Sequence, residues 1–582
     1  MNLHFVRGSR TKGVAIVMCI IMALFVMRLF YIQVIQHAYY MEQADSEQMK
    51  KFVLHAQRGE IYAMDGTTPT KIVMNETVYT VWADPTEVVE ADKVVEVLNR
   101  VAGGNVRDDF KQYLTKKDTR YQVLARKVTR TQAELIKKEN LAGIGFDAVS
   151  QRVYPEGSLA AQVIGFVDAE GNGKYGFEQA NDTTLKGVDG VLKTVTDVRS
   201  VPLTVGDKNI NVPAKNGANY VLTIDRNVQT KVEQALSDGM KNVGASQGSA
   251  LVMDPNTGKV LAMANLPSFD PSNLSAVTDL SALNNNIITN PYEPASVMKT
   301  VAMSTGVDKG VMTPDSTYVN TDSIVIDDKT VQNATKGQTG TITMQHAMNW
   351  SLNTGSVTMA TWLGNGSVDA KARGILYQYY HDKFRLGEKT GIELANEQAG
   401  TVIPPTDAQG NAIRYANMTF GQGLDVTTLQ VATAFSAIIN GGVYRQPTVI
   451  AGTMSDDGQT FRAATAKSGE QIIKQSTSDT MKQMIYNARQ AFPNYHSSDR
   501  SGFYVGGKTG TAQTIENGQY VFDQTIATYV GFGGEVGQKP AYVVMIEVYG
   551  PHKNLDGGHH ALPIFTDISN WMIDYLKLTP QG

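Results

Sequence analysis

The sequence contains a single cysteine, Cys19, among its 582 residues. One thiol excludes an intrachain disulfide framework and the cysteine clusters that bind structural zinc or iron–sulfur centres. A basic surplus is also missing, because 52 Lys and Arg residues stand against 56 Asp and Glu residues, for a net charge of −4. A general nucleic-acid binder would carry a basic excess or a basic stripe, so the composition disfavours that class.

Broad disorder is disfavoured as well, because hydrophobic residues make up 42% of the chain and charged residues 19%. We find neither an internal repeat at a fixed period nor a low-complexity tract. A single hydrophobic core does not extend over 582 residues, so the length predicts several domains.

The N-terminus carries one long apolar run. Residues 1–12 contain three Lys and Arg side chains and no acidic one, and residues 13–35 are then mostly apolar, with Arg28 as the single charge. A helix over residues 13–35 would span roughly 34 Å, enough to cross a bilayer. Arg28 lies near one end of it, where a guanidinium can reach the interface. The sequence therefore predicts a single-pass anchor at 13–35, a cytoplasmic tail at 1–12 and an extracytoplasmic remainder.

Two other interpretations of this run are weaker. A cleaved signal peptide would have a shorter apolar region ending in small residues, whereas this run ends in large ones, residues 29–35. A lipoprotein site at Cys19 would need a small residue before the cysteine, and Met18 stands there. We therefore favour an uncleaved anchor in the cell membrane.

Residues 45–215 mix strand-like and helical runs, and nothing in them resembles a reactive constellation. We predict a pedestal domain here, distinct from residues 216–580. Its glycine-rich stretch, residues 165–190, is interpreted as loops and turns. The expected elements include a strand at 77–82 and helices at 94–101 and 131–139.

Residues 216–580 read as strands, then a helical block, then strands again. This order favours an α+β domain whose sheet is assembled from both ends of its sequence. The expected elements are strands at 219–224, 248–252, 260–263, 525–532 and 541–549, a helix at 225–236, and a helical block at about 290–490 that includes residues 428–440.

A Ser-x-x-Lys motif at residues 296–299 is the first of three that indicate chemistry. Pro294 and the apolar run after Lys299 predict that Ser296 stands at a helix start, and the spacing puts both functional groups on one helical face. A neutral lysine can take the serine proton, and a helix N-terminus offers N–H groups to an oxyanion. Alone the motif is weak, because residues 9–12 match it within a basic tail.

Two further motifs lie downstream. Ser-Leu-Asn at residues 351–353 would be an ordinary polar loop in isolation. Lys-Thr-Gly-Thr at residues 508–511 follows an apolar run, so it lies in or beside a strand whose small residues let a substrate backbone approach. A second Lys-Thr-Gly at residues 389–391 lacks the Thr-Ala-Gln that follows the first, and we interpret it as a surface turn.

The three motifs together, in this order and spacing, are far more specific than any one of them, and such a set is shared by class A β-lactamases and penicillin-binding proteins. The chain resembles the class B, monofunctional penicillin-binding proteins, the membrane-anchored transpeptidases of bacterial cell-wall synthesis. Asn353 is more like the septal division branch than the elongation branch. The resemblance also rests on Arg58-Gly59-Glu60-Ile61, Arg152-Val153-Tyr154-Pro155, Gly176-Phe177-Glu178, Thr223-Ile224-Asp225 and Phe420-Gly421-Gln422-Gly423.

The chain departs from the family pattern at three places. Residues 62–66 read Tyr-Ala-Met-Asp-Gly where the family usually has Asp-Arg-Asn-Gly after the isoleucine. Leu352 replaces a small residue in the second motif, and Ala295 replaces the glycine that usually precedes the nucleophile. The first departure affects the pedestal, and the other two affect loop shape.

The resemblance implies a peptidoglycan D,D-transpeptidase that crosslinks D-Ala-D-Ala stem peptides through an acyl-enzyme on Ser296 during cell division. Lys299 would accept the Ser296 proton, and Lys508 would lower the pKa of Lys299 as a nearby cation. Ser351 would relay a proton toward the leaving amine, and Asn353 would bind the substrate amide.

The same resemblance implies how the substrate is held. Backbone N–H groups of Ser296 and Thr511 would form the oxyanion hole. Lys508, Thr509 and Thr511, with Gly510 between them, would bind the terminal carboxylate. A β-lactam would acylate Ser296 and stay, because the sequence supplies no obvious base to activate water.

The implied architecture is a transmembrane helix, an elongated mixed α/β pedestal, and a transpeptidase domain with an antiparallel sheet, flanking helices and an all-helical subdomain. The implied partners are stem peptides, β-lactam antibiotics, the membrane, a SEDS-class glycosyltransferase and other division proteins. We expect no cofactor and no metal, because the spacing of His552, His559 and His560 in a glycine-rich loop does not support a site.

Several alternatives stay open at this point. The chain could serve elongation or sporulation rather than division. It could be a membrane-bound β-lactam sensor, a β-lactamase that hydrolyses its acyl-enzyme, or an inactive scaffold. The acceptor amine, lysine or diaminopimelate, cannot be deduced from the sequence.

Overall fold

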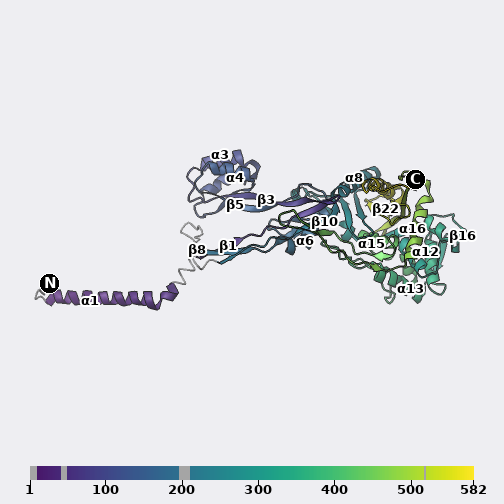
Figure 1. The fold of residues 1–582 in the computed structure, drawn as a ribbon, viewed down its shortest axis with the longest axis horizontal. Helices are drawn as coiled ribbons and strands as arrows, with labels where there is room; N and C mark the ends of the chain where they lie inside the picture. Colours follow the sequence, from purple (N-terminus) through teal and green to yellow (C-terminus); the bar gives the residue numbers. More distant parts are fainter. Residues whose placement is uncertain (1–8, 41–48, 196–209, 517–518, 582) are drawn as a thin grey trace. The chain divides into compact units, whose positions relative to one another are not determined.

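The computed structural model describes residues 9–40, 49–195, 210–516 and 519–581. The chain divides into two compact units, drawn together in Figure 1. The first comprises residues 1–57 and 187–217, and the second comprises residues 58–186 and 218–582.

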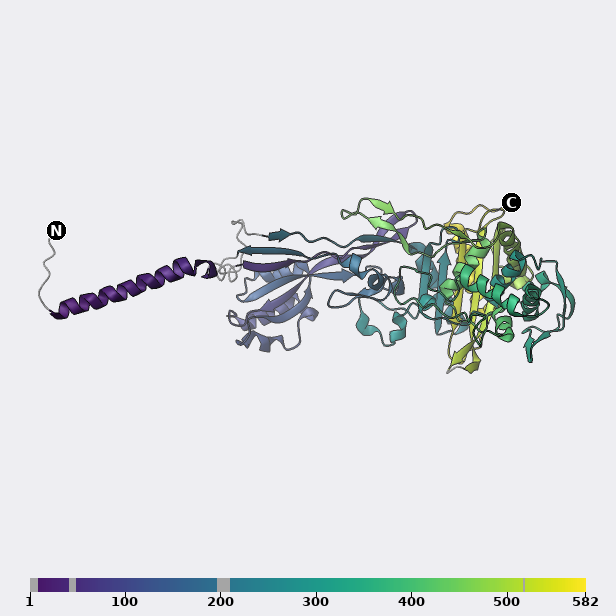
Figure 2. The same cartoon turned by 90° about the horizontal axis from the view of Figure 1, so that it is seen from below.

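The first unit contains a long apolar helix. Helix α1 (Ser9–Phe30) continues into a short π-helix, η1 (Tyr31–Ile35), and Figure 2 shows it in purple. Within the described residues this is the one helix long and apolar enough to cross a membrane. The predicted apolar run at 13–35 is therefore helical, and residues 9–12 are helical as well. The unit also holds an antiparallel sheet of β1 (Met49–Leu54), β8 (Gly190–Val195) and β9 (Ile210–Val212).

The second unit contains a seven-stranded sheet drawn from distant parts of the sequence. Strand β10 pairs in parallel with β2 and antiparallel with β18, so segments at residues 61–65, 219–225 and 450–454 meet in one sheet. The order is β19-β18-β10-β2-β3-β4, with β5 also on β3. The strands are β2 (Ile61–Asp65), β3 (Thr68–Ala83), β4 (Gln122–Val128), β5 (Ile144–Val153), β10 (Asn219–Asp225), β18 (Ile450–Met454) and β19 (Phe461–Ala463).

Helices cover the β3–β4 part of this sheet with a small hydrophobic core of their own. Helix α4 begins at Thr129, whose side chain and that of Gln132 form a reciprocal capping box. The predicted strand at 77–82 lies within β3, and the two predicted helices correspond to α3 and α4. The elements are α3 (Ala91–Val101), η2 (Gly103–Asn105), η3 (Phe110–Thr115) and α4 (Arg130–Lys138).

The glycine-rich stretch at 165–190 is not only loops and turns, so that interpretation was wrong in part. Phe177 and Leu185 are fully buried and anchor two short helices, while Gly165 and Gly176 take positive φ at the turns between elements. The glycines mark sharp chain reversals here rather than a lack of structure. The elements are α5 (Ala161–Ile164), β6 (Phe166–Val167), β7 (Gly173–Lys174), α6 (Gly176–Ala180) and α7 (Asp182–Lys186).

A buried ion cluster ties these short helices to the seven-stranded sheet. Glu178 is fully buried and accepts from Arg58 Nε at 2.7 Å and from Arg152 Nε at 2.8 Å. Arg58 also donates to Asp182 at 2.7 Å and Arg152 to Asn75 at 2.9 Å. Most charges in this cluster are therefore paired with an opposite charge.

The sheet that carries the candidate site has five antiparallel strands in the order β12-β11-β23-β22-β21. As predicted, the sheet combines strands from the start of the domain with strands from its C-terminal end, and β11 pairs directly with β23. The strand predicted at 219–224 is not part of it, because β10 pairs with β2 and β18 in the seven-stranded sheet. Strand β21 forms one edge. The strands are β11 (Gln247–Met253), β12 (Val260–Leu266), β21 (Phe503–Glu516), β22 (Gln519–Glu535) and β23 (Tyr542–Tyr549).

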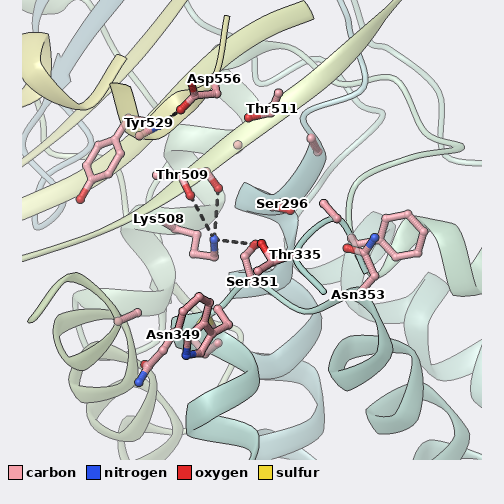
Figure 3. A pocket seen from close by; sticks show the side chains of 18 of the residues that line it. Ser296, Thr335, Asn349, Ser351, Asn353, Lys508, Thr509, Thr511, Tyr529 and Asp556 are labelled. Atoms are coloured by element: carbon pink, nitrogen blue, oxygen red, sulfur yellow. Dashed lines mark hydrogen bonds between the residues drawn. The ribbon is translucent and has the colours of Figure 1, made fainter. Parts of the chain in front are cut away.

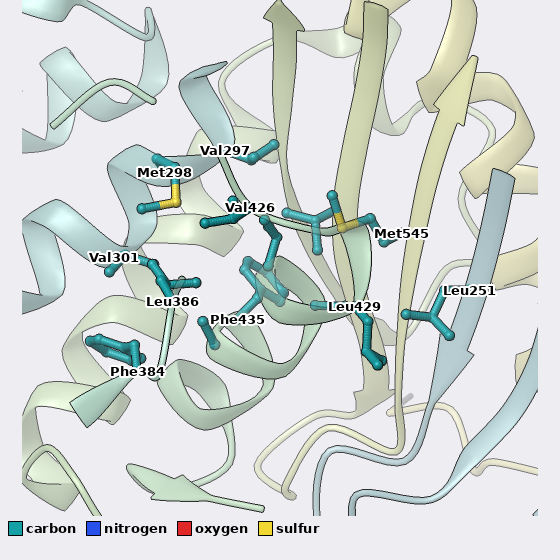
Figure 4. Packing of buried hydrophobic residues seen from close by; sticks show 14 of the residues in the cluster. Leu251, Val297, Met298, Val301, Phe384, Leu386, Val426, Leu429, Phe435 and Met545 are labelled. Carbon is teal, nitrogen blue, oxygen red and sulfur yellow. The ribbon is translucent and has the colours of Figure 1, made fainter. Parts of the chain in front are cut away.

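Helices pack on both faces of this sheet. On one face α8 (Arg226–Val243) and α18 (Leu562–Tyr575) bury a compact core. On the other face α15 (Thr428–Ile439), buried at every position, lies between the sheet and the helical block. Figure 4 shows this packing, with Leu251 and Met545 of the sheet on one side of α15 and Met298 and Val301 on the other.

The helical block lies at residues 286–496 and also carries small two-stranded hairpins. These hairpins qualify the expectation of an all-helical subdomain. Its α-helices are α9 (Asn286–Thr289), α10 (Lys299–Asp308), α11 (Met344–Asn349), α12 (Asn353–Leu363), α13 (Ala370–Tyr377), α14 (Ala412–Met418), α16 (Gln475–Gln490) and α17 (Pro493–His496). It also contains the short helices η6 (Ala295–Met298) and η7 (Gln378–Lys383). Three further short helices lie outside this range: η4 (Leu274–Ala276), η5 (Leu280–Leu283) and η8 (Gly557–Ala561). Its hairpin strands are β13 (Thr317–Asn320) with β16 (Gly340–Thr343), β14 (Ser323–Ile326) with β15 (Lys329–Gln332), and β17 (Val443–Tyr444) with β20 (Glu470–Gln471).

Candidate active site

A pocket of about 490 Å³ lies between the edge strand β21 and the helical block. The three sequence motifs, more than 200 residues apart from first to last (508 − 296 = 212), all contribute to its wall. Figure 3 shows Ser296, Ser351 and Lys508 facing one another in it. The lining also includes Asn353, Thr509, Gly510 and Thr511, whereas Lys299 lies directly beneath Ser296.

Ser296 lies in a 3₁₀ turn, η6, that leads directly into α10. The prediction of a helix start is correct, with the refinement that the first turn is 3₁₀ and Lys299 opens the α-helix. Ala295 has a φ of 51°, a left-handed conformation that favours glycine. Gly421 packs against Ala295 so closely that an added Cβ would lie 2.1 Å from the Ala295 carbonyl oxygen. The loop before the serine is therefore tightly held.

Lys299 is fully buried, and its amine has three oxygen neighbours. Nζ lies 2.8 Å from Ser296 Oγ, 2.6 Å from the Ser351 carbonyl oxygen and 3.1 Å from Ser351 Oγ. A neutral amine has two N–H groups and one lone pair. If both N–H groups are donated to Ser351, the lone pair is left for the Ser296 hydroxyl, which is the arrangement that a general base requires.

The environment favours this neutral form. Burial, and then the neighbouring Lys508, hold the pKa of Lys299 well below its usual range. Burial lowers the pKa of Lys508 to about 7. Neither lysine forms an ion pair with a carboxylate in the part of the chain that the structure describes, so no acid counteracts the burial.

Ser351 connects the two lysines. Its Oγ lies 2.8 Å from Lys508 Nζ and 3.1 Å from Lys299 Nζ, so one hydroxyl bridges both amines. Its φ of 56° is left-handed, which for a residue other than glycine costs of order 1–3 kcal/mol and is typical of functional sites. Through this conformation both the carbonyl oxygen and the hydroxyl of Ser351 reach Lys299.

The third motif lies on β21, as predicted, at the sheet edge. At Gly510 an added Cβ would lie 2.2 Å from Thr528 Oγ1 and 3.1 Å from the Pro294 carbonyl oxygen, so only glycine lets β21 approach the Ser296 turn. Lys508 Nζ donates to the Thr509 carbonyl oxygen at 3.2 Å. Thr511 lines the pocket, and its Oγ1 accepts from Gly557 N at 3.3 Å.

Asn353 begins helix α12 and faces the pocket opening. Its side-chain amide donates to the Gln332 carbonyl oxygen at 2.8 Å. That bond orients the amide and leaves one N–H and the Oδ1 oxygen for a ligand. Leu352, the departure from the family pattern, is fully buried and packs in the core.

Glu293 holds a second loop against the serine turn. It is almost fully buried and accepts from Gly423 N at 2.6 Å and from Tyr520 Oη at 3.1 Å. Burial raises the pKa of Glu293. Through these bonds the loop at 420–423 and the β21–β22 hairpin are both joined to the segment that carries Ser296.

The second Lys-Thr-Gly lies elsewhere in the fold. Thr390 is 7% exposed, and its N–H and Oγ1 both donate to Glu397 Oε1, at 2.7 Å and 2.6 Å. Glu397 therefore replaces solvent as the partner of Thr390, whereas Lys389 and Gly391 on either side of it are exposed, so the interpretation as a surface segment holds for these two residues and is wrong for Thr390. The Ser-x-x-Lys at 9–12 lies in α1, in the first unit.

Some lining residues were not singled out from the sequence. The position of Trp350 directly before Ser351 was a signal that it lines the pocket. The lining residues on α16, on α17 and in the loop before α18 had no such signal, because no sequence motif marks these segments. The register of β22 on β21, which pairs Tyr529 with Thr509, is equally invisible in the sequence. The lining residues in question are Ala334, Thr335, Met348, Asn349, Trp350, Ala488, Phe492, Tyr495, Tyr529 and Asp556.

Comparisons with known proteins agree with this geometry. Residues 248–570 match the family model described as the penicillin binding protein transpeptidase domain, and residues 53–222 match that of the penicillin-binding protein dimerisation domain. The chain is 32% identical over 513 residues to the penicillin-binding protein PbpB of Mycobacterium tuberculosis, covering 84% of this chain and 71% of that one. It is 26% identical to the peptidoglycan D,D-transpeptidase FtsI of Escherichia coli, covering 97% and 92%.

The fold is shared with a solved structure. Penicillin binding protein 3 of M. tuberculosis, complexed with aztreonam, superposes with a TM-score of 0.67 at 26% identity and covers 91% of this chain and 98% of its own. These relatives are named as penicillin-binding proteins and as a peptidoglycan transpeptidase, so the comparisons do not favour the alternatives that the chain is a β-lactam sensor or a β-lactamase. The chain belongs to the penicillin-binding protein transpeptidase family, as a class B member of the FtsI type.

Proposed function

We propose that the chain is a peptidoglycan D,D-transpeptidase that forms its crosslinks through an acyl-enzyme on Ser296. The observation that carries the proposal is the three-oxygen environment of Lys299, with its amine 2.8 Å from Ser296 Oγ and no carboxylate partner among the described residues. An amine in this position can take the proton of one specific hydroxyl.

In the first half-reaction Ser296 Oγ attacks the carbonyl carbon between two D-alanines of a stem peptide, and Lys299 accepts the hydroxyl proton. Backbone N–H groups of Ser296 and Thr511 stabilise the oxyanion, a contribution commonly worth about 10²–10³ in rate per donor. The proton then passes from Lys299 through Ser351 to the leaving amine, and D-alanine departs.

The polar residues that line the pocket make the remaining contacts with the substrate. Lys508, when protonated, attracts the terminal carboxylate together with the hydroxyls of Thr509 and Thr511. Gly510 lets the substrate backbone lie beside β21. The free N–H and Oδ1 of Asn353 bind an amide of the donor peptide.

The second half-reaction uses an amine from a neighbouring stem peptide rather than water. Among the described residues that line the pocket, Asp556 is the one carboxylate. Its Oδ1 accepts from Gly558 N and His559 N, both at 3.0 Å, so it is occupied as a helix cap. A β-lactam ester on Ser296 therefore meets no free carboxylate to activate water and persists.

Fluorescent penicillin tests this proposal on the full-length protein in detergent. We expect one covalent label per chain in wild type, no label in Ser296→Ala, and no steady-state penicillin turnover. A label that persists in Ser296→Ala would overturn the assignment of the nucleophile, and rapid turnover would favour a β-lactamase.

We also propose the arrangement in the cell. Helix α1 with η1 anchors the protein once in the membrane, with residues 1–12 in the cytoplasm and the remainder outside. Residues 45–215 act as a non-catalytic pedestal, and residues 216–580 as the transpeptidase domain. The names of the relatives favour a role in division, with a SEDS-class glycosyltransferase and other division proteins as partners. Localisation of a tagged chain tests this, since a lateral-wall pattern would favour elongation.

A further inference from the structure

The pocket extends past Lys508 into a second part with aromatic walls. We call it the aromatic lobe, and β21 runs along both parts. Successive strand residues advance roughly 3.3 Å, so Gly507 lies about 13 Å along the strand from Thr511. In Figure 3, Tyr529 and Asn349 lie on one side of Lys508, and Thr335 and Asn353 on the other. The aromatic lobe is lined by Trp350, Ala488, Phe492, Tyr495, Gly507 and Tyr529.

Three of these rings form a continuous wall. The ring centroids of Trp350 and Phe492 are 5.0 Å apart in an edge-to-face contact, and those of Phe492 and Tyr495 are 5.3 Å apart. All three side chains are half-buried and line the pocket. They therefore offer apolar surface to a ligand, and the order of the rings is fixed by their mutual packing.

The opposite wall is rigid. Tyr529 Oη accepts from the buried Arg489 at 2.6 Å, and Arg489 is paired with Asp499. A Cβ at Gly507 would lie 2.3 Å from the Tyr529 hydroxyl oxygen, and one at Gly558 would lie 2.8 Å from that of Tyr495. Glycine at both positions therefore lets Tyr529 pack against β21 and Tyr495 pack against the loop before α18.

The reaction itself indicates what enters the aromatic lobe. The donor's terminal carboxylate binds at Lys508 and Thr509, so the leaving D-alanine lies on the Lys508 side of Ser296. By microscopic reversibility, the amine that attacks the acyl-enzyme takes the position that the leaving amine vacates. The rest of the acceptor must then extend away from Ser296 on that same side, where the aromatic lobe opens.

We propose that the aromatic lobe is the acceptor subsite and binds the methylene chain of a primary alkylamine whose nitrogen attacks the Ser296 ester. This rests on the proposed function. An aliphatic chain suits stacked rings, because methylene groups gain contact area there while the nitrogen reaches the polar part of the pocket. None of the six residues that line the lobe is a carboxylate, and Asp556 elsewhere in the pocket wall is occupied as a cap, so the lobe would select by shape and apolar contact rather than by ion pairing.

The transfer step balances without a further reactant. The amine nitrogen forms a bond to the ester carbonyl carbon, and the bond between that carbon and Ser296 Oγ breaks. One amine proton passes to Lys299 and from there to Oγ. The products are a new amide and the free Ser296 hydroxyl.

The test measures how the acyl-enzyme partitions between an amine and water. Full-length protein in detergent is acylated by an N-acyl-D-alanyl thioester in the presence of primary alkylamines of increasing chain length, and the ratio of amide to free acid is measured. Phe492→Ala removes the middle ring, and Ala488→Leu fills the lobe. Phe522→Ala, at a side chain 85% exposed on β22, is the matched control.

In wild type we expect the ratio to rise with chain length, by up to about fourfold per added methylene. Phe492→Ala and Ala488→Leu should each lower the ratio about tenfold and flatten this dependence, while Phe522→Ala leaves it unchanged. The second-order rate constant for penicillin acylation should be unchanged in Phe522→Ala, and in Phe492→Ala and Ala488→Leu it should fall by much less than the amide-to-acid ratio does, which separates acceptor binding from donor chemistry.

Two results would overturn the proposal: an unchanged ratio in Phe492→Ala and Ala488→Leu, or an acylation rate that falls in step with the ratio, which would assign the lobe to the donor. If either Phe492→Ala or Ala488→Leu is not labelled by penicillin because it does not fold, the ratio is measured in the other variant and in Tyr495→Leu. Failure of wild type to bind penicillin would instead refute the proposed function.

Discussion

Two of the clusters of buried positive charge in the second unit differ in one respect, because only one of them takes part in the proposed chemistry. In the pedestal cluster Arg58 and Arg152 share the buried carboxylate of Glu178, and Asp182 adds a further negative charge. Burial alone would lower the pKa of Arg58, but the two carboxylates outweigh it and raise the pKa. The ion pairs of this cluster join short helices to a sheet.

The catalytic cluster buries Lys299 and Lys508 with no such partner in the described chain. Their pKa values fall instead, that of Lys299 well below its usual range and that of Lys508 to about 7, so the neutral amine becomes accessible. Lysine suits this role because its pKa shifts readily on burial, whereas arginine keeps its charge. The presence or absence of a carboxylate thus separates a structural cation from a catalytic one.

Removing the base should have the largest effect. Lys299→Gln keeps an N–H donor toward Ser351 but has no basic lone pair for Ser296, so we expect penicillin acylation to fall by about 10³-fold or more. Stopped-flow labelling measures it. Lys389→Gln, at the exposed lysine of the second Lys-Thr-Gly, is the control and should label at the wild-type rate. Comparable labelling of Lys299→Gln would show that another group is the base.

Breaking the paired cluster should affect stability rather than chemistry. Glu178→Gln leaves two nearly buried arginines with a single nearby carboxylate, Asp182, and removal of one member of a buried ion pair typically costs about 3–5 kcal/mol. Urea unfolding followed by tryptophan fluorescence measures the loss. Glu170→Gln, exposed on a neighbouring loop, is the matched control. If the folded fraction of Glu178→Gln acylates more slowly, the separation between the two clusters fails.

The smallest effect should come from the strained loop before Ser296. Ala295→Gly relieves a left-handed φ that costs about 1–2 kcal/mol, and the lost chain entropy of glycine offsets about 0.5–1 kcal/mol of that gain. We expect a stabilisation of up to about 1 kcal/mol with an unchanged acylation rate. Ala245→Gly, where φ is not positive, should instead destabilise. A loss of stability in Ala295→Gly would mean that the methyl group contributes packing.

Much of the catalytic centre could be predicted from the sequence, because its reactive side chains lie in three short motifs. Ser296, Ser351 and Lys508 converge as expected, and the strands at both ends of the domain form one sheet. The catalytic spacing of Lys299 from Ser296 is local, so helical geometry alone anticipates it.

The rest depends on tertiary contacts that no local pattern encodes. The carbonyl of Ser351 accepts from Lys299, and the backbone at Ser351 is left-handed, which no local pattern predicts for a serine. Thr390 is buried because Glu397, several residues later, satisfies its polar groups. The aromatic lobe joins side chains from separate elements, and the helices within residues 165–190 arise from burial of Phe177 and Leu185 despite many glycines.

The central claim is that Lys299 is neutral because it is buried beside a second cation. The pH dependence of the second-order rate constant for penicillin acylation tests it most directly, in wild type and in Lys508→Gln. Wild type should lose rate below the pKa of Lys299, as the base becomes protonated, and again above about pH 7, as Lys508 loses the charge that attracts the β-lactam carboxylate.

In Lys508→Gln the repulsion that lowers the pKa of Lys299 is gone, so that pKa should rise. The account predicts an acid limb displaced to higher pH and no alkaline limb near pH 7, whatever the absolute rate. An acid limb that stays in place or moves to lower pH would contradict it.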